Sequence, residues 1–149
     1  MPRFSKESND IILRYMNEWK KSGKERRKDP FVYLSTKIPH NHKQICYYWY
    51  NKLDPKLCKM PLTNNEQDHI IDWVERYLMY NVNQQNIPWK KLQKEMKSVF
   101  NKLHSTNVIK NFWNSRKRRL MREAENILNP LIFDNYLVMG GQLFIVTRQ

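Results

Sequence analysis

One segment of the chain, residues 105–115, reads STNVIKNFWNS and carries different side chains on two faces of a predicted helix. Amide and amine side chains recur in it at the spacing i, i+3, i+4 and i+7, which places them on one face. They are Asn107, Lys110, Asn111 and Asn114. Ile109 and Trp113 fall on the opposite, apolar face. Asparagine is a poorer helix former than glutamate or lysine. The pattern therefore favours a face that hydrogen-bonds a partner, the alternative being a solvated face.

Positive charge continues along the same predicted helix. The basic residues are Arg116, Lys117, Arg118, Arg119 and Arg122. Such a run binds phosphate groups regardless of base sequence. It is also typical of a nuclear-import signal, and the two roles are compatible. A second basic stretch, residues 20–28, is either another phosphate-binding loop or a solvated loop.

The chain contains an internal duplication. Five pairs of apolar residues lie 58 positions apart: Phe4 and Leu62, Ile12 and Ile70, Trp19 and Tyr77, Phe31 and Trp89, and Leu34 and Leu92. Two further pairs lie 64 positions apart: Ile45 and Ile109, and Trp49 and Trp113. The second copy therefore has six extra residues between its second and third helices. Agreement at these positions predicts two copies of one folding unit.

Apolar spacing predicts three helices in each copy, and hence an all-α fold of two three-helix bundles in tandem. In the first copy, the predicted helix starts are Ser5 or Ser8, Asp29-Pro30 and about Asn41. In the second copy, they are the Thr63–Glu66 capping box, Pro88-Trp89 and about Ser105. We expect the first repeat at residues 4–58 and the second at 62–128, with the polar-faced helix at about 105–122. The tryptophans are expected in the cores.

The pattern changes after Asn129-Pro130. Two β-prone runs, residues 131–139 and 142–147, flank Gly140-Gly141, which predicts a C-terminal β-hairpin within residues 130–149. An isolated hairpin is barely stable, so it must pack on the helical bundles or dock on a partner protein. The residues expected to dock are Phe133, Tyr136, Val138, Phe144 and Val146.

Two segments carry a family resemblance. Residues 43–55, KQICYYWYNKLDP, and residues 105–115 resemble the third helices of consecutive Myb repeats. The likeness extends over about residues 4–120, is weak in the first and second helices and is specific in the last. It implies tandem homeobox-like, helix-turn-helix repeats that bind double-stranded DNA, with each third helix in the major groove.

The resemblance also implies roles for single residues. It implies base contacts from Lys43, Asn107, Lys110, Asn111 and Asn114, and backbone contacts from Ser115 and the basic residues after it. Side-chain chemistry agrees, because lysine donates to guanine and asparagine can pair with adenine through two hydrogen bonds.

The chain departs from the family pattern mainly in the first repeat. Phe4, Phe31 and Leu62 stand where the family carries tryptophan, and they keep apolar bulk. Cys46 and Tyr47 occupy groove-facing positions where charged residues are usual. We therefore expect the first repeat either to read DNA poorly or to contact proteins, as some SANT repeats do.

Composition excludes several classes of function. The 149 residues carry a net charge of +13 and are 40% hydrophobic, which favours a polyanionic partner such as nucleic acid. Cys46 and Cys58 alone form no disulfide framework and indicate a reducing, intracellular compartment. No run of about 18 apolar residues predicts a membrane span.

No catalytic constellation stands out, so we expect neither an enzyme nor a bound cofactor. Two histidines and two cysteines, at His40, His42, Cys46 and Cys58, match no common zinc spacing, and no metal site is expected.

The sequence thus predicts a nuclear DNA-binding protein that regulates transcription by occupancy or supplies DNA binding to a complex. A weaker resemblance is to the small homeobox-like subunits of ciliate DNA adenine-N6 methyltransferase complexes, which favours a non-catalytic accessory subunit as the alternative. A SANT-type module for basic histone tails is the second alternative. The chain's own positive charge argues against it.

Overall fold

The computed structural model describes the backbone of residues 3–22, 29–84, 86–132, 136–139 and 142–145, and side chains as far as residue 128. Residues 1–109 form one compact unit and residues 110–149 a second, with the boundary inside the last helix. The described residues are mainly helical, as the sequence predicts. None of the helices among them is long and apolar enough to cross a bilayer.

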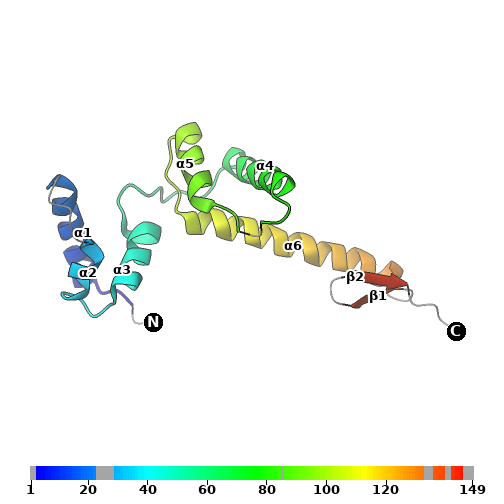
Figure 1. The fold of residues 1–149 in the computed structure, drawn as a ribbon, viewed down its shortest axis with the longest axis horizontal. Coiled ribbons are helices and arrows are strands. Elements are labelled where there is room, and N and C mark those ends of the chain that lie inside the picture. Colours follow the sequence, from blue (N-terminus) through cyan, green and yellow to red (C-terminus); the bar gives the residue numbers. More distant parts are fainter. Residues whose placement is uncertain (1–2, 23–28, 85, 133–135, 140–141, 146–149) are drawn as a thin grey trace. The chain divides into compact units, whose positions relative to one another are not determined.

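The first bundle is built from α1 (Lys6–Lys21), α2 (Pro30–Ser35) and α3 (His42–Tyr48) (Figure 1). Each helix begins at a side chain that accepts a hydrogen bond from a backbone N–H in the first turn. These residues are Ser5, Asp29 and Asn41. Ser5, rather than Ser8, therefore begins α1. Asn41 and Gln44 additionally form a capping box, which holds the start of α3.

The third helix does not end regularly, although the sequence predicts only a regular helix there. Its last turn is the π-helical segment η2 (Trp49–Leu53), in which the Asp54 N–H donates to the Trp49 carbonyl over 3.0 Å. Asp54 is extended, with ψ of 121°, because a following proline disfavours the helical conformation. The helix thus ends at Asp54-Pro55, as predicted.

The main buried cluster of the first bundle consists of apolar residues. Its buried residues are Ile12, Met16, Phe31, Leu34, Ile38, Ile45 and Trp49. The Phe4 ring stacks on His40 and Tyr48, with centroids 3.8 Å and 4.0 Å away. Phenylalanine therefore provides the packing that a tryptophan provides in the family pattern.

The second set of helices is α4 (Asn64–Tyr80), α5 (Trp89–Phe100) and α6 (Thr106–Ile132). The capping box at Thr63 and Glu66 is confirmed. The Trp73 indole N–H donates to Glu95 over 2.7 Å and joins α4 to α5. Several residues at the 58- and 64-residue offsets are buried in both copies: Ile12 and Ile70, Leu34 and Leu92, Ile45 and Ile109, and Trp49 and Trp113. The burial pattern thus repeats at these four pairs. Of the tryptophans expected in the cores, Trp49 and Trp113 are buried, whereas Trp19, Trp73 and Trp89 are only half-buried.

Backbone hydrogen bonding ties the segment after the first bundle to the turn before α6. The Cys58 N–H donates to the Leu103 carbonyl over 2.7 Å, beside a parallel bridge between Leu57 and Leu103. Leu57 is buried at this junction. Both partners belong to the unit of residues 1–109.

The C-terminal part differs from the expectation in one respect. Leu131 and Ile132, assigned from sequence to a β-prone run, are the last residues of α6. A short apolar run does not distinguish strand from helix by its periodicity. The strands are β1 (Tyr136–Met139) and β2 (Gln142–Ile145), paired antiparallel with Tyr136 opposite Ile145. The turn at Gly140-Gly141 lies outside the described residues, so the complete hairpin stays a prediction.

The docking residues expected in this segment are not described at the level of side chains. Phe133 and Val146 lie outside the described residues, and for Tyr136, Val138 and Phe144 only the backbone is described. Their role stays a prediction.

Candidate nucleic-acid interface

The start of α6 is held by a buried polar cluster. Ser105, itself buried, accepts a hydrogen bond from the Val108 N–H over 3.1 Å. The Gln93 amide on α5 donates to the His104 carbonyl over 2.8 Å. The His104 imidazole lies 3.0 Å from the Glu66 carboxylate of α4, and both side chains are 1% exposed. The three helices of the second set therefore meet in polar contacts just before the polar-faced helix begins.

Glu66 is the centre of this cluster. One carboxylate oxygen accepts from the Thr63 N–H over 3.0 Å, and the other lies 3.5 Å from the Lys102 amine. Burial favours the neutral carboxyl, but the Thr63 hydrogen bond and the charges of His104 and Lys102 outweigh it. They hold the pKa of Glu66 below its ordinary value of 4.5. The carboxylate is therefore ionised at neutral pH.

The two faces predicted for residues 105–115 are present on α6. Ile109 is fully buried and Trp113 is 8% exposed. On the polar face, Lys110 and Asn111 are exposed, whereas Asn107 and Asn114 are half-buried. Because the helix is continuous through these positions, the amide and amine groups lie along one line at the molecular surface. Such a line can donate and accept hydrogen bonds along an extended partner.

One of these amides already has a partner from the first repeat. The Asn107 side-chain amide donates to the Tyr47 hydroxyl of α3 over 2.6 Å. Tyr47 is 52% exposed, so its hydroxyl is at the surface rather than in a core. Sequence analysis placed Tyr47 at a groove-facing position but did not identify this contact, because 60 residues separate the partners. The bond orients the Asn107 amide beside α3.

The basic residues after Trp113 are exposed or half-buried, and several make contacts within α6. The Arg116 guanidinium lies 5.7 Å from the Trp113 ring centroid, and Arg118 donates to the Ser115 hydroxyl over 3.3 Å. Arg119 pairs with Glu123 over 3.8 Å. Lys117 and Arg122 are exposed. Surface contacts of this kind contribute little free energy and exchange readily for a phosphate.

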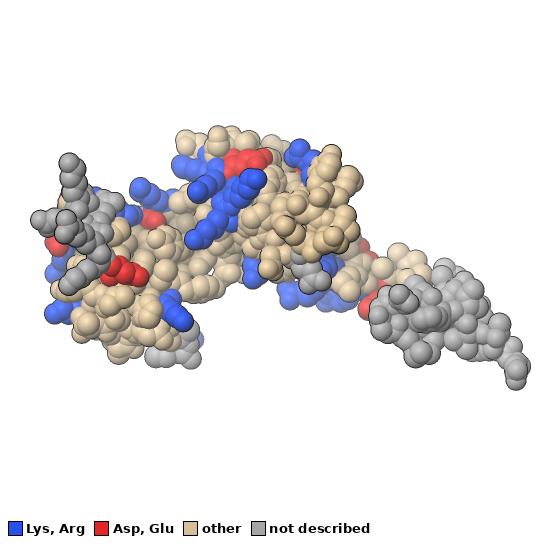
Figure 2. Space-filling model, viewed as in Figure 1, with Lys and Arg blue, Asp and Glu red and all other residues tan. Residues whose placement is uncertain are grey.

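A second basic surface was missed by the sequence analysis. The segment WKKLQKEMK forms most of α5, and its four lysines, Lys90, Lys91, Lys94 and Lys97, are exposed. Figure 2 shows lysine and arginine side chains over α5 as well as along α6. The density of lysine in residues 89–97 was the signal that could have revealed it.

The first repeat offers fewer groups on its third helix. Lys43 is exposed on α3, one residue before the capping residue Gln44. Burial, with a smaller effect of Asp29, raises the pKa of the Cys46 thiol, and Lys90 opposes this only in part. The thiol therefore stays protonated at neutral pH, when it is a poor nucleophile and a poor metal ligand. Within the described part of the chain, no group of histidine, cysteine or acidic residues could hold a metal ion.

The basic stretch at residues 20–28 is described only in part. Lys20 lies 3.7 Å from Asp54 and 4.9 Å from the Trp49 ring centroid, so its side chain packs at the end of η2. Residues 23–28 lie outside the described residues. Lys20 thus has partners within the chain, and the phosphate-binding role expected for this stretch stays a prediction.

Comparison with known proteins gives two similarities. Over 85 residues the chain is 33% identical to the transcription factor MYB104 of Arabidopsis thaliana, a match that covers 57% of this chain and 19% of that protein. The structure resembles Trichomonas vaginalis Myb2, solved in complex with MRE-1-12 DNA, with a TM-score of 0.54 and 19% identity. That match covers 80% of this chain and 97% of the Myb2 chain. No protein-family model matches the sequence.

The Myb2 similarity concerns the fold, and the MYB104 similarity concerns the sequence of a segment that spans about a fifth of that protein. The chain is therefore similar to Myb proteins, in sequence over those 85 residues and in fold over 80% of its length.

Proposed function

We propose that this protein binds double-stranded DNA and inserts α6 into the major groove. One observation carries the proposal: a line of exposed and half-buried amide and amine groups on α6 lies opposite the buried Ile109 and Trp113 and runs directly into a basic segment. A major groove admits one helix and displays donors and acceptors that such groups can pair with. The similarity to a transcription factor and to a Myb protein solved with DNA supports the proposal.

The polar line on α6 would read bases. Lys110 is the guanine-reading residue in this proposal, because its amine can donate to O6 and N7. Asn111 is exposed and can pair with adenine N6 and N7 through both amide atoms. Asn107 and Asn114 flank them one turn away on the same face. Lys43 contributes a base contact from the first repeat.

The basic residues after Trp113 would hold the phosphates. Ser115, Arg116, Lys117, Arg118, Arg119 and Arg122 form this set. Such contacts set affinity and register rather than base preference. They also make the binding constant depend steeply on salt, because each phosphate contact releases counterions.

The salt dependence is the first test of this proposal. Replacing Arg116, Lys117, Arg118 and Arg119 by glutamine keeps good helix formers while removing four positive charges. At about 0.9 per lost phosphate contact, the slope of log K against log salt should become shallower by about 2–4. The measurement is fluorescence anisotropy of a labelled duplex across a salt series, with the full-length protein.

The matched control removes four charges from the other basic surface. Lys90, Lys91, Lys94 and Lys97 are replaced by glutamine, and a smaller change in slope is expected. An equal change would show that α6 has no special role in phosphate binding. A wild-type protein that shows no salt-dependent affinity for duplex DNA would overturn the proposed function itself.

The Tyr47 hydroxyl gives a second test. Replacing Tyr47 by phenylalanine keeps the ring but removes the partner of the Asn107 amide. One hydrogen bond contributes about 0.5–1.5 kcal/mol, so affinity for a duplex selected from a random library should fall about two- to tenfold. Affinity for random duplexes should change less. Tyr50→Phe, an exposed tyrosine on η2, is the control and should bind as the wild type does.

The two effects should not add. If the hydroxyl acts through Asn107, the double variant Tyr47→Phe with Asn107→Ala should bind no more weakly than Asn107→Ala alone. Additive losses would show that the hydroxyl affects binding by another route.

A protein with this function would act in the nucleus. It would either regulate transcription by occupying its DNA site or serve as the DNA-binding accessory subunit of a larger complex. The apolar residues within 130–149 support the second role, because a docking segment is of use to a subunit. A DNA adenine-N6 methyltransferase complex is one such assembly.

A further inference from the structure

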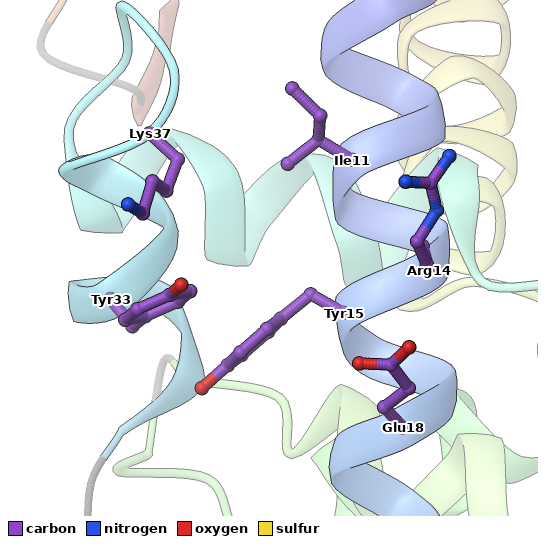
Figure 3. Close-up of a pocket in the computed structure, with 6 residues that line it drawn as sticks. All are labelled: Ile11, Arg14, Tyr15, Glu18, Tyr33 and Lys37. Atoms are coloured by element: carbon purple, nitrogen blue, oxygen red, sulfur yellow. The ribbon is translucent and has the colours of Figure 1, made fainter.

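A surface pocket of about 300 Å³ lies between α1 and α2 (Figure 3). Its lining residues are Ile11, Arg14, Tyr15 and Glu18 from α1, and Tyr33 and Lys37 from α2 and the turn after it. The lining contains no residue of α3 or α6. The DNA-binding function therefore leaves this surface unexplained.

The floor of the pocket is apolar and partly open. The rings of Tyr15 and Tyr33 stack with centroids 4.5 Å apart and planes inclined by 19°. Tyr33 is 44% exposed and Ile11 38%. Because the two tyrosines stack on each other, no planar base or ring can insert between them. An aliphatic or aromatic side chain can instead lie against their outer surface and against Ile11.

The rim is predominantly basic. Arg14 is exposed, and within the described part of the chain it forms no ion pair or hydrogen bond. The Lys37 amine lies 5.6 Å from the Tyr33 ring centroid and is also exposed. Glu18 is the single acidic residue among those lining the pocket. The helix α1 and the turn after α2 therefore each contribute a cation beside an apolar floor.

We propose that this pocket is a docking site for an acidic, amphipathic peptide segment of a partner protein. One apolar side chain of the segment enters the pocket, and carboxylates on either side of it pair with Arg14 and Lys37. A site with such exposed walls encloses too little of a small ligand, whereas a peptide gains contacts along the surface around it. The charge of the rim, like the net charge of +13, selects an acidic segment over a basic one.

A cage for a methylated lysine is a poorer match. Such cages surround a cation with separate aromatic faces, whereas here one tyrosine face is covered by the other ring and the Lys37 amine lies over the Tyr33 ring. The available cation–π position is thus already occupied from within the chain.

The experiment uses the full-length protein and a labelled 15-residue peptide with leucine and tryptophan on one helical face and glutamate on the other. Anisotropy should show saturable binding, and the amide resonances of Ile11, Tyr15 and Tyr33 should shift. Tyr33→Ala and Arg14→Glu should each weaken binding at least about fivefold. Both positions are at the surface, so neither change should unfold the bundle.

Matched variants and a second peptide test whether binding depends on this pocket or only on overall charge and on exposed tyrosines. Lys6→Glu makes the same charge change on α1 outside the pocket, and Tyr80→Ala removes a tyrosine that is 82% exposed on α4. Both should bind the peptide as the wild type does. Equal binding of a peptide with glutamine in place of glutamate, or equal losses in the controls, would overturn the proposal.

Duplex DNA separates this site from the proposed function. Tyr33→Ala and Arg14→Glu should keep wild-type affinity for the duplex, and the peptide should bind the DNA complex as it binds the free protein. If these variants lose duplex affinity and the peptide does not bind, the surface belongs to the DNA interface and the docking site does not exist. If the wild-type protein does not bind duplex DNA, the proposed function fails, but the peptide titration still tests the docking site by itself.

Discussion

The double variant Lys110→Ala with Asn111→Ala is expected to lose most discrimination between its selected duplex and random duplexes. Both side chains are exposed on the polar face of α6, so their removal leaves no cavity. A well-placed pair of hydrogen bonds to a base contributes about 1–3 kcal/mol of discrimination. Two lost pairs amount to about 2–6 kcal/mol, or a factor of about thirty or more. Competition anisotropy against both duplexes measures this ratio directly.

The same variant should keep most of its affinity for random DNA, because only one positive charge is lost. Lys6→Ala with Asn83→Ala is the matched control, since it removes the same two residue types from exposed positions on α1 and the α4–α5 loop. The control should discriminate as the wild type does. A Lys110 and Asn111 variant that loses specific and random binding in equal proportion would assign these residues to phosphate contact instead of base reading.

Replacing Glu66 by alanine is expected to destabilise the second repeat by about 3–5 kcal/mol, as removal of one partner from a buried ionic contact does. The change leaves the buried His104 imidazole without its carboxylate and removes the acceptor for the Thr63 N–H. Urea unfolding followed by tryptophan fluorescence measures the loss. Asp68→Ala, an exposed acid on the same helix, should change stability by about 0.5 kcal/mol or less. Equal effects of the two changes would contradict the role given to Glu66.

Stability should also depend on pH through this carboxylate. The folded state lowers the pKa of Glu66 below 4.5. Its contribution is therefore fully present above the unfolded pKa and is lost as the pH falls through the lower, folded pKa. Glu66→Gln keeps a capping-box side chain but cannot ionise, so its stability should vary less over this acidic range. The same acid dependence in Glu66→Gln as in the wild type would assign the effect to other carboxyls.

Much of the helical framework could be predicted because it depends on local chemistry. A threonine followed three residues later by glutamate satisfies the free N–H groups of a helix start wherever it occurs, and the Thr63–Glu66 capping box is present in the structure. The recurrence of apolar residues at 58- and 64-residue offsets predicted burial that is seen at both members of four pairs. The end at Asp54-Pro55 followed from the backbone restriction imposed by proline.

Contacts between distant residues could not be predicted in this way. The Tyr47 hydroxyl meets the Asn107 amide across 60 positions, and no periodicity in either helix indicates which hydroxyl an exposed amide will find. Glu66 was predicted as a capping residue, but its contacts with His104 and Lys102 depend on how α4 meets the turn before α6. The stacking of Tyr15 on Tyr33 likewise depends on the packing of α1 against α2.

By itself, the amino-acid sequence determined where most helices begin, much of the apolar core and the resemblance to Myb repeats. Tertiary structure decided which polar groups meet, and hence that a tyrosine of the first repeat holds an asparagine of the second. The physical reason is the range of the interactions. Capping and apolar periodicity act within a few residues of one helix, whereas hydrogen bonds between helices require two surfaces to be in place before their partners are defined.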